Sequence, residues 1–188
     1  MSSNKLSNAD TKPTSFELAE FQKPKSGEDL IIDMSVVVEP LDGPMQKKAT
    51  VSVNLPGWSD WEITCDEGTS GGGDDTAPAP LMFFSAGVAF CLMTHMQMAA
   101  KQLGLTLKTL RLEQRSQFAS KFNFETMHPK DNFGSGKNFQ TFVHVESDDA
   151  PELIEEFVSW CEQACMAGQS IANSVPTQTK IVLNGTEL

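Results

Sequence analysis

The chain has 188 residues, the usual size of one domain and enough to bury a core without disulfides or metal ions. Its 14 Lys and Arg residues stand against 25 Asp and Glu residues, which gives a net charge of −11 at pH 7. A surface of this charge repels phosphate backbones and anionic lipid surfaces. The composition therefore argues against nucleic acid and membranes as partners.

The amino-terminal segment 1–29 is polar, and we expect a partly disordered extension followed by a single domain over 30–188. The first ten residues lack the basic, apolar and small-residue layout of a secretory signal, which predicts a cytoplasmic protein. In a reducing cytoplasm the four cysteines are expected to be thiols rather than structural bridges.

Three strand-like segments come next, separated by turn residues, and they predict an antiparallel meander. They are Leu30–Glu39, Ala49–Leu55 and Trp58–Asp66. The segment 67–80 is rich in Gly, Asp and Pro, so we expect a mobile loop.

A long helix is predicted from Pro80 to Gly104, because proline suits a first helical turn and glycine suits a helix end. Its stretch Leu81–Ala100 carries no formal charge and approaches the roughly 20 apolar residues that span a bilayer. Polar residues within the stretch favour the other reading, a helix at the centre of a soluble core.

The second half of the chain predicts a β-hairpin with a long tip, a second helix and a closing strand. The strands are Leu105–Phe118, another strand to about Thr126, Phe139–Glu146 and Thr179–Leu183. The second helix begins near Pro151 and runs through Cys165 until Gly168 loosens the pattern. The order βββ, long α, βββ, α, β indicates an α+β protein with antiparallel sheets.

Two cysteines on different predicted helices are the best candidates for chemistry. Cys91 lies in the middle of the long helix, and Cys165 lies on the apolar face of the second. Either one alone would ordinarily be an inert small hydrophobic residue. Together they could present two sulfurs to the same core.

His95 lies one helical turn after Cys91, where it could pair with a thiolate, although packing within a helix interface explains it equally well. Cys161 repeats this spacing with Cys165, so the four side chains are also ligand types for a tetrahedral zinc site. Both pairs lie in helices rather than in tight turns, and we therefore predict no metal and no cofactor.

The segment from Pro80 to Cys91 resembles the signature of the OsmC and organic hydroperoxide resistance family, in which a helix-starting proline precedes the reactive cysteine by eleven positions. Cys165, ten residues before Val175, is similar to the second cysteine position of that family. The resemblance covers roughly residues 30–185.

The resemblance implies an intertwined homodimer with two antiparallel sheets around a long central helix. It also implies a thiol-dependent peroxidase acting in oxidative stress defence. Cys91 would attack an organic hydroperoxide, Cys165 would resolve the sulfenic acid to a disulfide, and a dithiol would reduce the disulfide. His95 is our candidate for a third catalytic residue.

The sequence departs from the family pattern at two partners of the reactive cysteine. Leu81 stands at the position of the family's glutamate, and the first arginine of the chain is Arg111, after the amino-terminal strands. Lys47, Lys48 and Arg115 are other candidates for the missing cation. A non-catalytic protein that binds an apolar small molecule at the dimer interface is the alternative.

Overall fold

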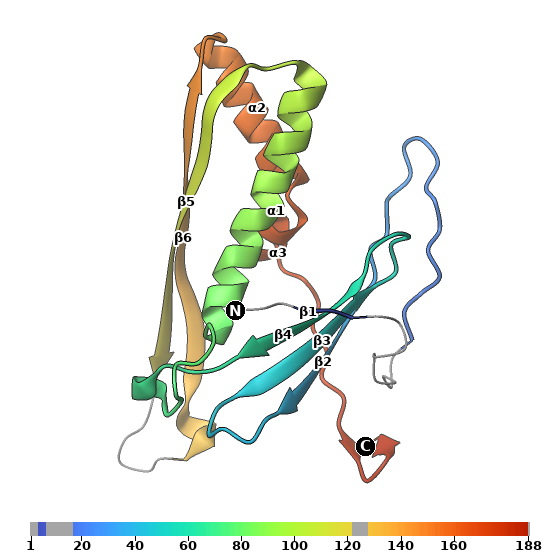
Figure 1. Cartoon of the computed structure of the whole chain (residues 1–188), viewed down its shortest axis with the longest axis vertical. Coiled ribbons are helices and arrows are strands. Elements are labelled where there is room, and N and C mark those ends of the chain that lie inside the picture. Colours follow the sequence, from blue (N-terminus) through green and yellow to red (C-terminus); the bar gives the residue numbers. More distant parts are fainter. Residues whose placement is uncertain (1–3, 7–16, 122–127, 188) are drawn as a thin grey trace. The chain divides into compact units, whose positions relative to one another are not determined.

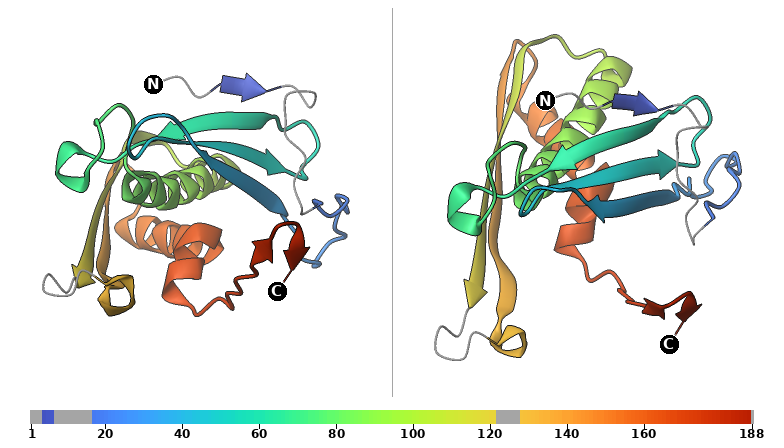
Figure 2. Two further views of the ribbon diagram at one scale, coloured as in Figure 1. Left: turned by 90° about the horizontal axis from the view of Figure 1, so that it is seen from below. Right: turned by 60° about the horizontal axis from the view of Figure 1, so that its bottom comes forward.

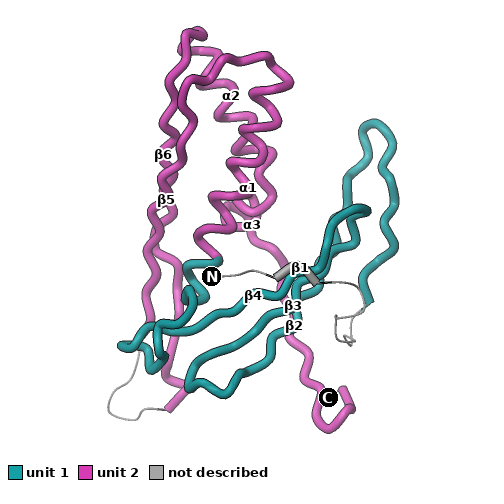
Figure 3. Tube along the Cα trace, viewed as in Figure 1, with its two compact units in different colours: residues 1–83 teal, residues 84–188 magenta. Residues whose placement is uncertain are grey.

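A computed structural model of the chain describes residues 4–6, 17–121 and 128–187. These residues form two compact units, 1–83 and 84–188 (Figure 3). Helix α1 (Pro80–Leu103) begins in the first unit and continues into the second, so one domain over 30–188 stays a prediction.

The first unit contains a four-stranded antiparallel sheet in the order β1-β4-β3-β2 (Figures 1 and 2). Its strands are β1 (Asn4–Leu6), β2 (Met34–Pro40), β3 (Lys47–Val53) and β4 (Asp60–Cys65). The predicted meander is thus confirmed as β2, β3 and β4. Strand β1 lies inside the segment expected to be an extension and adds an edge strand that the sequence did not predict.

The turn between β3 and β4 is a tight one at Pro56 and Gly57. The N–H of Trp58 donates to the carbonyl oxygen of Leu55 at 3.3 Å, and Gly57 has a φ of +80°. Proline followed by a residue with positive φ is typical of a type II turn, which glycine adopts without steric cost.

The buried carboxylate of Asp66 organises the Gly-rich loop that follows β4. It accepts hydrogen bonds from the N–H groups of Glu67, Asp74 and Thr76 at 2.8, 3.2 and 3.0 Å, and from the Thr76 hydroxyl at 2.7 Å. A short 3-10 helix, η1 (Thr69–Gly71), lies within the loop. These bonds hold together both ends of a segment that the sequence predicts to be mobile.

In the second unit, two helices lie side by side against one face of a long hairpin (Figures 1 and 2). The hairpin is β5 (Leu107–Lys121) paired with β6 (Phe133–Ser147), and a second short 3-10 helix, η2 (Pro129–Asp131), precedes β6. The predicted strand end at Thr126 falls outside the described residues. Strand β5 runs as one element to Lys121, past the predicted end at Phe118.

The predicted bounds of the long helix are confirmed. Helix α1 ends at Leu103, and Gly104 follows with a φ of +69° while the N–H of Leu105 donates to the carbonyl of Ala100 at 3.0 Å. A left-handed residue after the last turn satisfies carbonyls that would otherwise lack partners.

The core of the second unit joins α1 to α2 (Pro151–Ala164). Its buried side chains are Leu92, Met96, Phe157, Cys161 and Cys165, and Leu110, Leu112 and Val143 of the hairpin pack against them. Leu110 and Leu112 share one face of β5, as their alternation predicts.

Helix α1 is the one helix among the described residues that is long and apolar enough to cross a membrane by length and composition. Val88, Leu92 and Met96 are buried, and Leu92 and Met96 belong to the core of the second unit. Packing on α2 and the hairpin therefore accounts for part of its apolar sequence.

The carboxyl-terminal part differs from the prediction in two places. The second helix does not run through Cys165: α2 ends at Ala164, and a separate helix α3 spans Met166–Ala172. The closing strand is reduced to β7 (Val182–Leu183), which pairs only with β8 (Thr186–Glu187). Asn184 and Gly185, both with positive φ, form the turn between β7 and β8.

Candidate functional site

Cys91 and Cys165 meet in the core of the second unit. Cys91 lies in the middle of α1 and is partly exposed, whereas Cys165 is 2% exposed at the junction of α2 and α3. Cys91 packs against the buried cluster that includes Cys165, and it raises the pKa of the Cys165 thiol. Two thiols 74 positions apart in sequence are therefore neighbours in this core.

The backbone changes direction at Cys165 because this residue caps α3. Its φ and ψ of −71° and 97° are extended, and its sulfur accepts a hydrogen bond from the N–H of Gly168 at 3.3 Å. The first N–H groups of a helix have no partner within the helix, and a side-chain acceptor at the N-cap position satisfies one of them. Cys165 is therefore fixed by the helix that it begins.

The electrostatic surroundings of Cys165 favour the protonated thiol. Burial raises the pKa of Cys165 and is the largest effect. The Gly168 N–H lowers this pKa, and the neighbouring Cys91 raises it.

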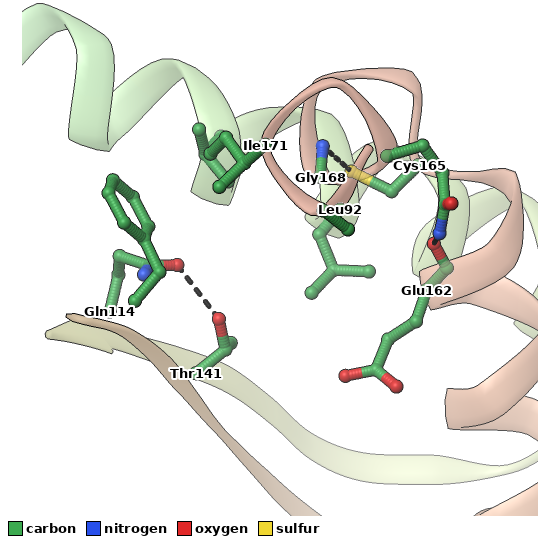
Figure 4. A pocket seen from close by; sticks show the side chains of 11 residues that line it. Leu92, Gln114, Thr141, Glu162, Cys165, Gly168 and Ile171 are labelled. Carbon is green, nitrogen blue, oxygen red and sulfur yellow. Dashed lines mark hydrogen bonds between the residues drawn. The ribbon is translucent and has the colours of Figure 1, made fainter. Parts of the chain in front are cut away.

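A pocket of about 410 Å³ opens on Cys165 (Figure 4). It lies between α1, the hairpin and the α2–α3 junction. Its lining residues are Val88, Leu92, Gln114, Phe139, Thr141, Glu162, Cys165, Gly168, Gln169, Ile171 and Ala172. Cys91 does not line it, so the sulfur that faces this pocket is that of Cys165.

The hairpin wall of the pocket is held by polar and aromatic contacts. The Thr141 hydroxyl donates to the side-chain oxygen of Gln114 at 2.8 Å, which ties β6 to β5 (Figure 4). Phe139 packs edge-to-face with Phe84 and Phe118, with ring centroids 5.7 and 5.6 Å apart. These contacts hold the hairpin side chains that form the pocket wall opposite the helices.

None of the lining residues is a lysine, arginine or histidine. Among the candidate cations, Lys47 and Lys48 form ion pairs with Glu67 and Glu62 in the first unit. Arg115 pairs with Glu113 at 2.6 Å and lies 4.9 Å from the ring centroid of Phe142.

His95 lines a different pocket, of about 260 Å³, together with Cys161 and Trp160. No hydrogen bond between His95 and Cys91 occurs among the interactions of the described residues. Its role in catalysis stays a prediction.

The alternative zinc site is not assembled. Within residues 4–6, 17–121 and 128–187, no group of three or more His, Cys, Asp and Glu side chains is placed to hold a metal ion. The helix break explains this separation, because Cys161 faces the pocket of His95 whereas Cys165 faces the other pocket.

Two features of the site were not predicted from sequence. Gly168 appeared only as a residue that loosens a helix, and its amide is in fact the donor to Cys165. The polar lining residues Gln114, Thr141 and Gln169 carry no sequence signal, since each occupies an ordinary position on a strand or helix.

The sequence profile of the OsmC-like protein family matches residues 72–180, more than half of the chain. The protein therefore belongs to the OsmC-like protein family. A comparison with curated proteins gives no match.

Solved structures with the same fold include an OsmC-like hydroperoxide resistance protein from Jannaschia sp. CCS1. It is 21% identical, with a TM-score of 0.53, and the match covers 84% of this chain and 96% of that one. A putative osmotic stress induced and detoxification response protein from Psychrobacter arcticus 273-4 is 15% identical, with a TM-score of 0.51 over 80% and 90% of the two chains. At these identities the likeness establishes the α+β fold with antiparallel sheets and a long helix.

Proposed function

We propose that this protein is a thiol-dependent peroxidase that reduces organic hydroperoxides in the cytoplasm, with Cys91 peroxidatic and Cys165 resolving. The observation that carries the proposal is that the two thiols are neighbours in the core of the second unit. The substrate class is supported by membership of the OsmC-like protein family and by the name of the similar structure from Jannaschia, an OsmC-like hydroperoxide resistance protein.

The proposed cycle uses both sulfurs. The Cys91 thiolate attacks the terminal oxygen of ROOH, the O–O bond breaks, and the alkoxide leaves as ROH after protonation. Cys165 then attacks the sulfur of the Cys91 sulfenic acid, which forms the disulfide and releases water. A dithiol returns two electrons and two protons and restores both thiols.

The assignment of roles is supported by the difference in exposure, because Cys91 is partly exposed whereas Cys165 is buried and its pKa is raised by burial. The test is a sulfenic-acid trap in single variants exposed to one equivalent of cumene hydroperoxide. Cys165→Ser should accumulate sulfenic acid at Cys91, and Cys91→Ser should leave Cys165 unreacted. Trapping at Cys165 in the Cys91→Ser variant would reverse the roles.

Turnover gives the second test. The reduced protein should lose two thiols for each hydroperoxide consumed, and Cys91→Ser should abolish turnover with a dithiol. Cys161→Ser is the matched control, because Cys161 lies on the neighbouring turn of α2 and faces the other pocket. Normal turnover by Cys91→Ser excludes the function.

His95 is our proposed third catalytic residue, acting as a cation one turn from Cys91. His95→Gln should then slow the sulfenic acid step. His144→Gln, on β6 and 3.6 Å from Glu113, is the control and should leave the rate unchanged. An unchanged rate of sulfenic acid formation in His95→Gln removes His95 from the mechanism.

We also propose that the chain is a homodimer. Large apolar side chains on α1 are exposed, and Phe90, at 71%, is the most exposed of them. An apolar helix face of this kind marks an interaction surface. Phe90→Glu should shift the mass measured by sedimentation toward the monomer, because it places a charge on this apolar face.

A non-catalytic binding protein is the second candidate function. The observation that favours it is a pocket with an apolar wall and no cation among its lining residues. Native mass spectrometry of freshly purified protein would reveal a bound ligand, and unreactive thiols in the same sample would favour binding over catalysis.

A further inference from the structure

The pocket that opens on Cys165 has an unusual charge balance. Its wall combines the apolar side chains Val88, Leu92 and Ile171 with amide and hydroxyl groups. Glu162 is the single charged residue that lines it. Any molecule that reaches Cys165 from this pocket therefore passes a negative charge.

The backbone of Glu162 is held at the α2–α3 junction. Its carbonyl oxygen accepts the N–H of Cys165 at 3.3 Å and the side-chain amide of Gln169 at 3.0 Å. The side chain extends from α2 toward the hairpin (Figure 4). No ion pair to Glu162 occurs among the described residues, so its charge is not neutralised by a neighbour.

Coulomb's law gives the size of the effect. At a separation of about 7 Å in bulk water, one unit charge changes the local concentration of a singly charged ligand by about threefold. A cation and an anion of the same shape therefore differ by roughly tenfold, and less at high salt. The net charge of −11 acts in the same direction over longer distances.

We propose that Glu162 makes this pocket selective for uncharged and cationic molecules with an apolar part, and that anionic molecules are excluded. Glu162 is then the residue that determines which molecules reach Cys165 from this pocket, and it takes no part in a chemical step. The proposed peroxidatic sulfur, Cys91, does not line the pocket, so this selectivity concerns Cys165 alone.

The test measures access to Cys165 without peroxide turnover. Three methanethiosulfonate reagents of similar size are used: one neutral, one with a trimethylammonium group and one with a sulfonate group. Each transfers its thiol portion to the Cys165 thiolate and releases methanesulfinate, and each rate is divided by the rate with a free small thiol. The protein carries Cys65→Ala, Cys91→Ala and Cys161→Ala, so that Cys165 is its only thiol.

The cationic reagent should react roughly tenfold faster than the anionic one in this background at low salt. Glu162→Gln should reduce the ratio roughly tenfold, to near unity, and Glu162→Lys should invert it. Glu156→Gln is the matched control, since it removes the same charge from α2 at a residue that does not line the pocket. The ratio should stay unchanged in that variant.

Equal effects of Glu156→Gln and Glu162→Gln would overturn the proposal, because net charge alone would then explain the ratio. Failure of all three reagents to modify Cys165 would also overturn it. If the triple variant does not fold, the reduced natural chain gives the same comparison, with Cys165 read separately by fragmentation mass spectrometry. A protein that discriminates between the reagents but consumes no hydroperoxide would refute the peroxidase and leave the pocket selectivity standing.

Discussion

The amide of Gly168 donates a hydrogen bond to the sulfur of Cys165 across 3.3 Å, and this bond forms where α2 ends and α3 begins. The same residue packs beside Cys91 and lines the pocket. In sequence Cys165 resembles one more apolar position of a helix, but in the structure it is a helix cap, the neighbour of a second thiol and part of a pocket wall.

The capping role predicts an order of stability for substitutions at Cys165. A serine hydroxyl can replace the sulfur as acceptor for the Gly168 N–H, whereas alanine leaves that N–H without a partner. Cys165→Ser should therefore be more stable than Cys165→Ala by about 1 kcal/mol. Urea denaturation of both reduced variants at pH 7 measures the difference.

Cys161 supplies the control for this order. It is buried within α2, one turn before Cys165, and caps no helix. A hydroxyl at this position is buried among apolar side chains, so Cys161→Ser should be no more stable than Cys161→Ala. The same order at both positions would show that the Gly168 bond does not stabilise α3.

The proximity of the two thiols predicts a change in the ionisation of Cys165. Because Cys91 raises the pKa of Cys165, Cys91→Ala should lower it. The pKa should still remain above the ordinary range, since burial is the largest cause of the shift. Alkylation by iodoacetamide as a function of pH, followed at Cys165 by peptide mass spectrometry, measures it.

Cys65→Ala is the control, because Cys65 lies on β4 in the other unit. It should leave the titration of Cys165 unchanged. A Cys165 titration that is the same in Cys91→Ala and in the natural chain would mean that the two sulfurs do not interact in solution.

Asp66 predicts a loss of stability in acid. The N–H of Thr76, followed by its hydroxyl, lowers the pKa of Asp66 to about 2, whereas an unfolded aspartate titrates near 3.9. A folded pKa below the unfolded one stabilises the protein above about pH 4, and this stabilisation is lost as the pH falls toward 2. Asp66→Asn should be destabilised at pH 7, and its difference from the natural chain should shrink between pH 4 and 2.

Asp74→Asn removes the same charge from the same loop but leaves the backbone N–H that Asp66 accepts. Its stability should follow that of the natural chain at each pH when measured by chemical denaturation. A parallel acid dependence of Asp66→Asn and the natural chain would show that another carboxylate controls acid unfolding.

Sequence patterns predict the parts of this fold that follow from local chemistry. Pro80 and Gly104 bracket α1 because one fits a first turn and the other a left-handed helix end. The alternation of Leu110 and Leu112 identifies the core face of β5. The Cys91 and Cys165 pair is predicted because each cysteine falls on the apolar face of a predicted helix.

The features that depend on tertiary contacts could not be predicted in this way. Cysteine is not a preferred N-cap residue, so the break at Cys165 leaves no signal in the apolar pattern of α2. Asp66 resembles any loop acid in sequence, and only the fold brings the Thr76 amide and hydroxyl to its carboxylate. The hydrogen-bond donors to these two side chains are backbone N–H groups and the Thr76 hydroxyl. A sequence pattern does not reveal which of these groups the fold brings together.

The final prediction compares two glycines of the loop that Asp66 holds. A Cβ at Gly73 would lie 2.0 Å from the carbonyl oxygen of Glu67 and 2.7 Å from a carboxylate oxygen of Asp66, whereas a Cβ at Gly68 would meet nothing within 4 Å. Gly73→Ala must displace backbone and break the Asp66 hydrogen bonds, so it should destabilise the protein by more than about 2 kcal/mol. Gly68→Ala should stay within about 0.5 kcal/mol of the natural chain, because its φ of −66° suits alanine. Equal unfolding midpoints for the two variants would show that the loop does not adopt this conformation in solution.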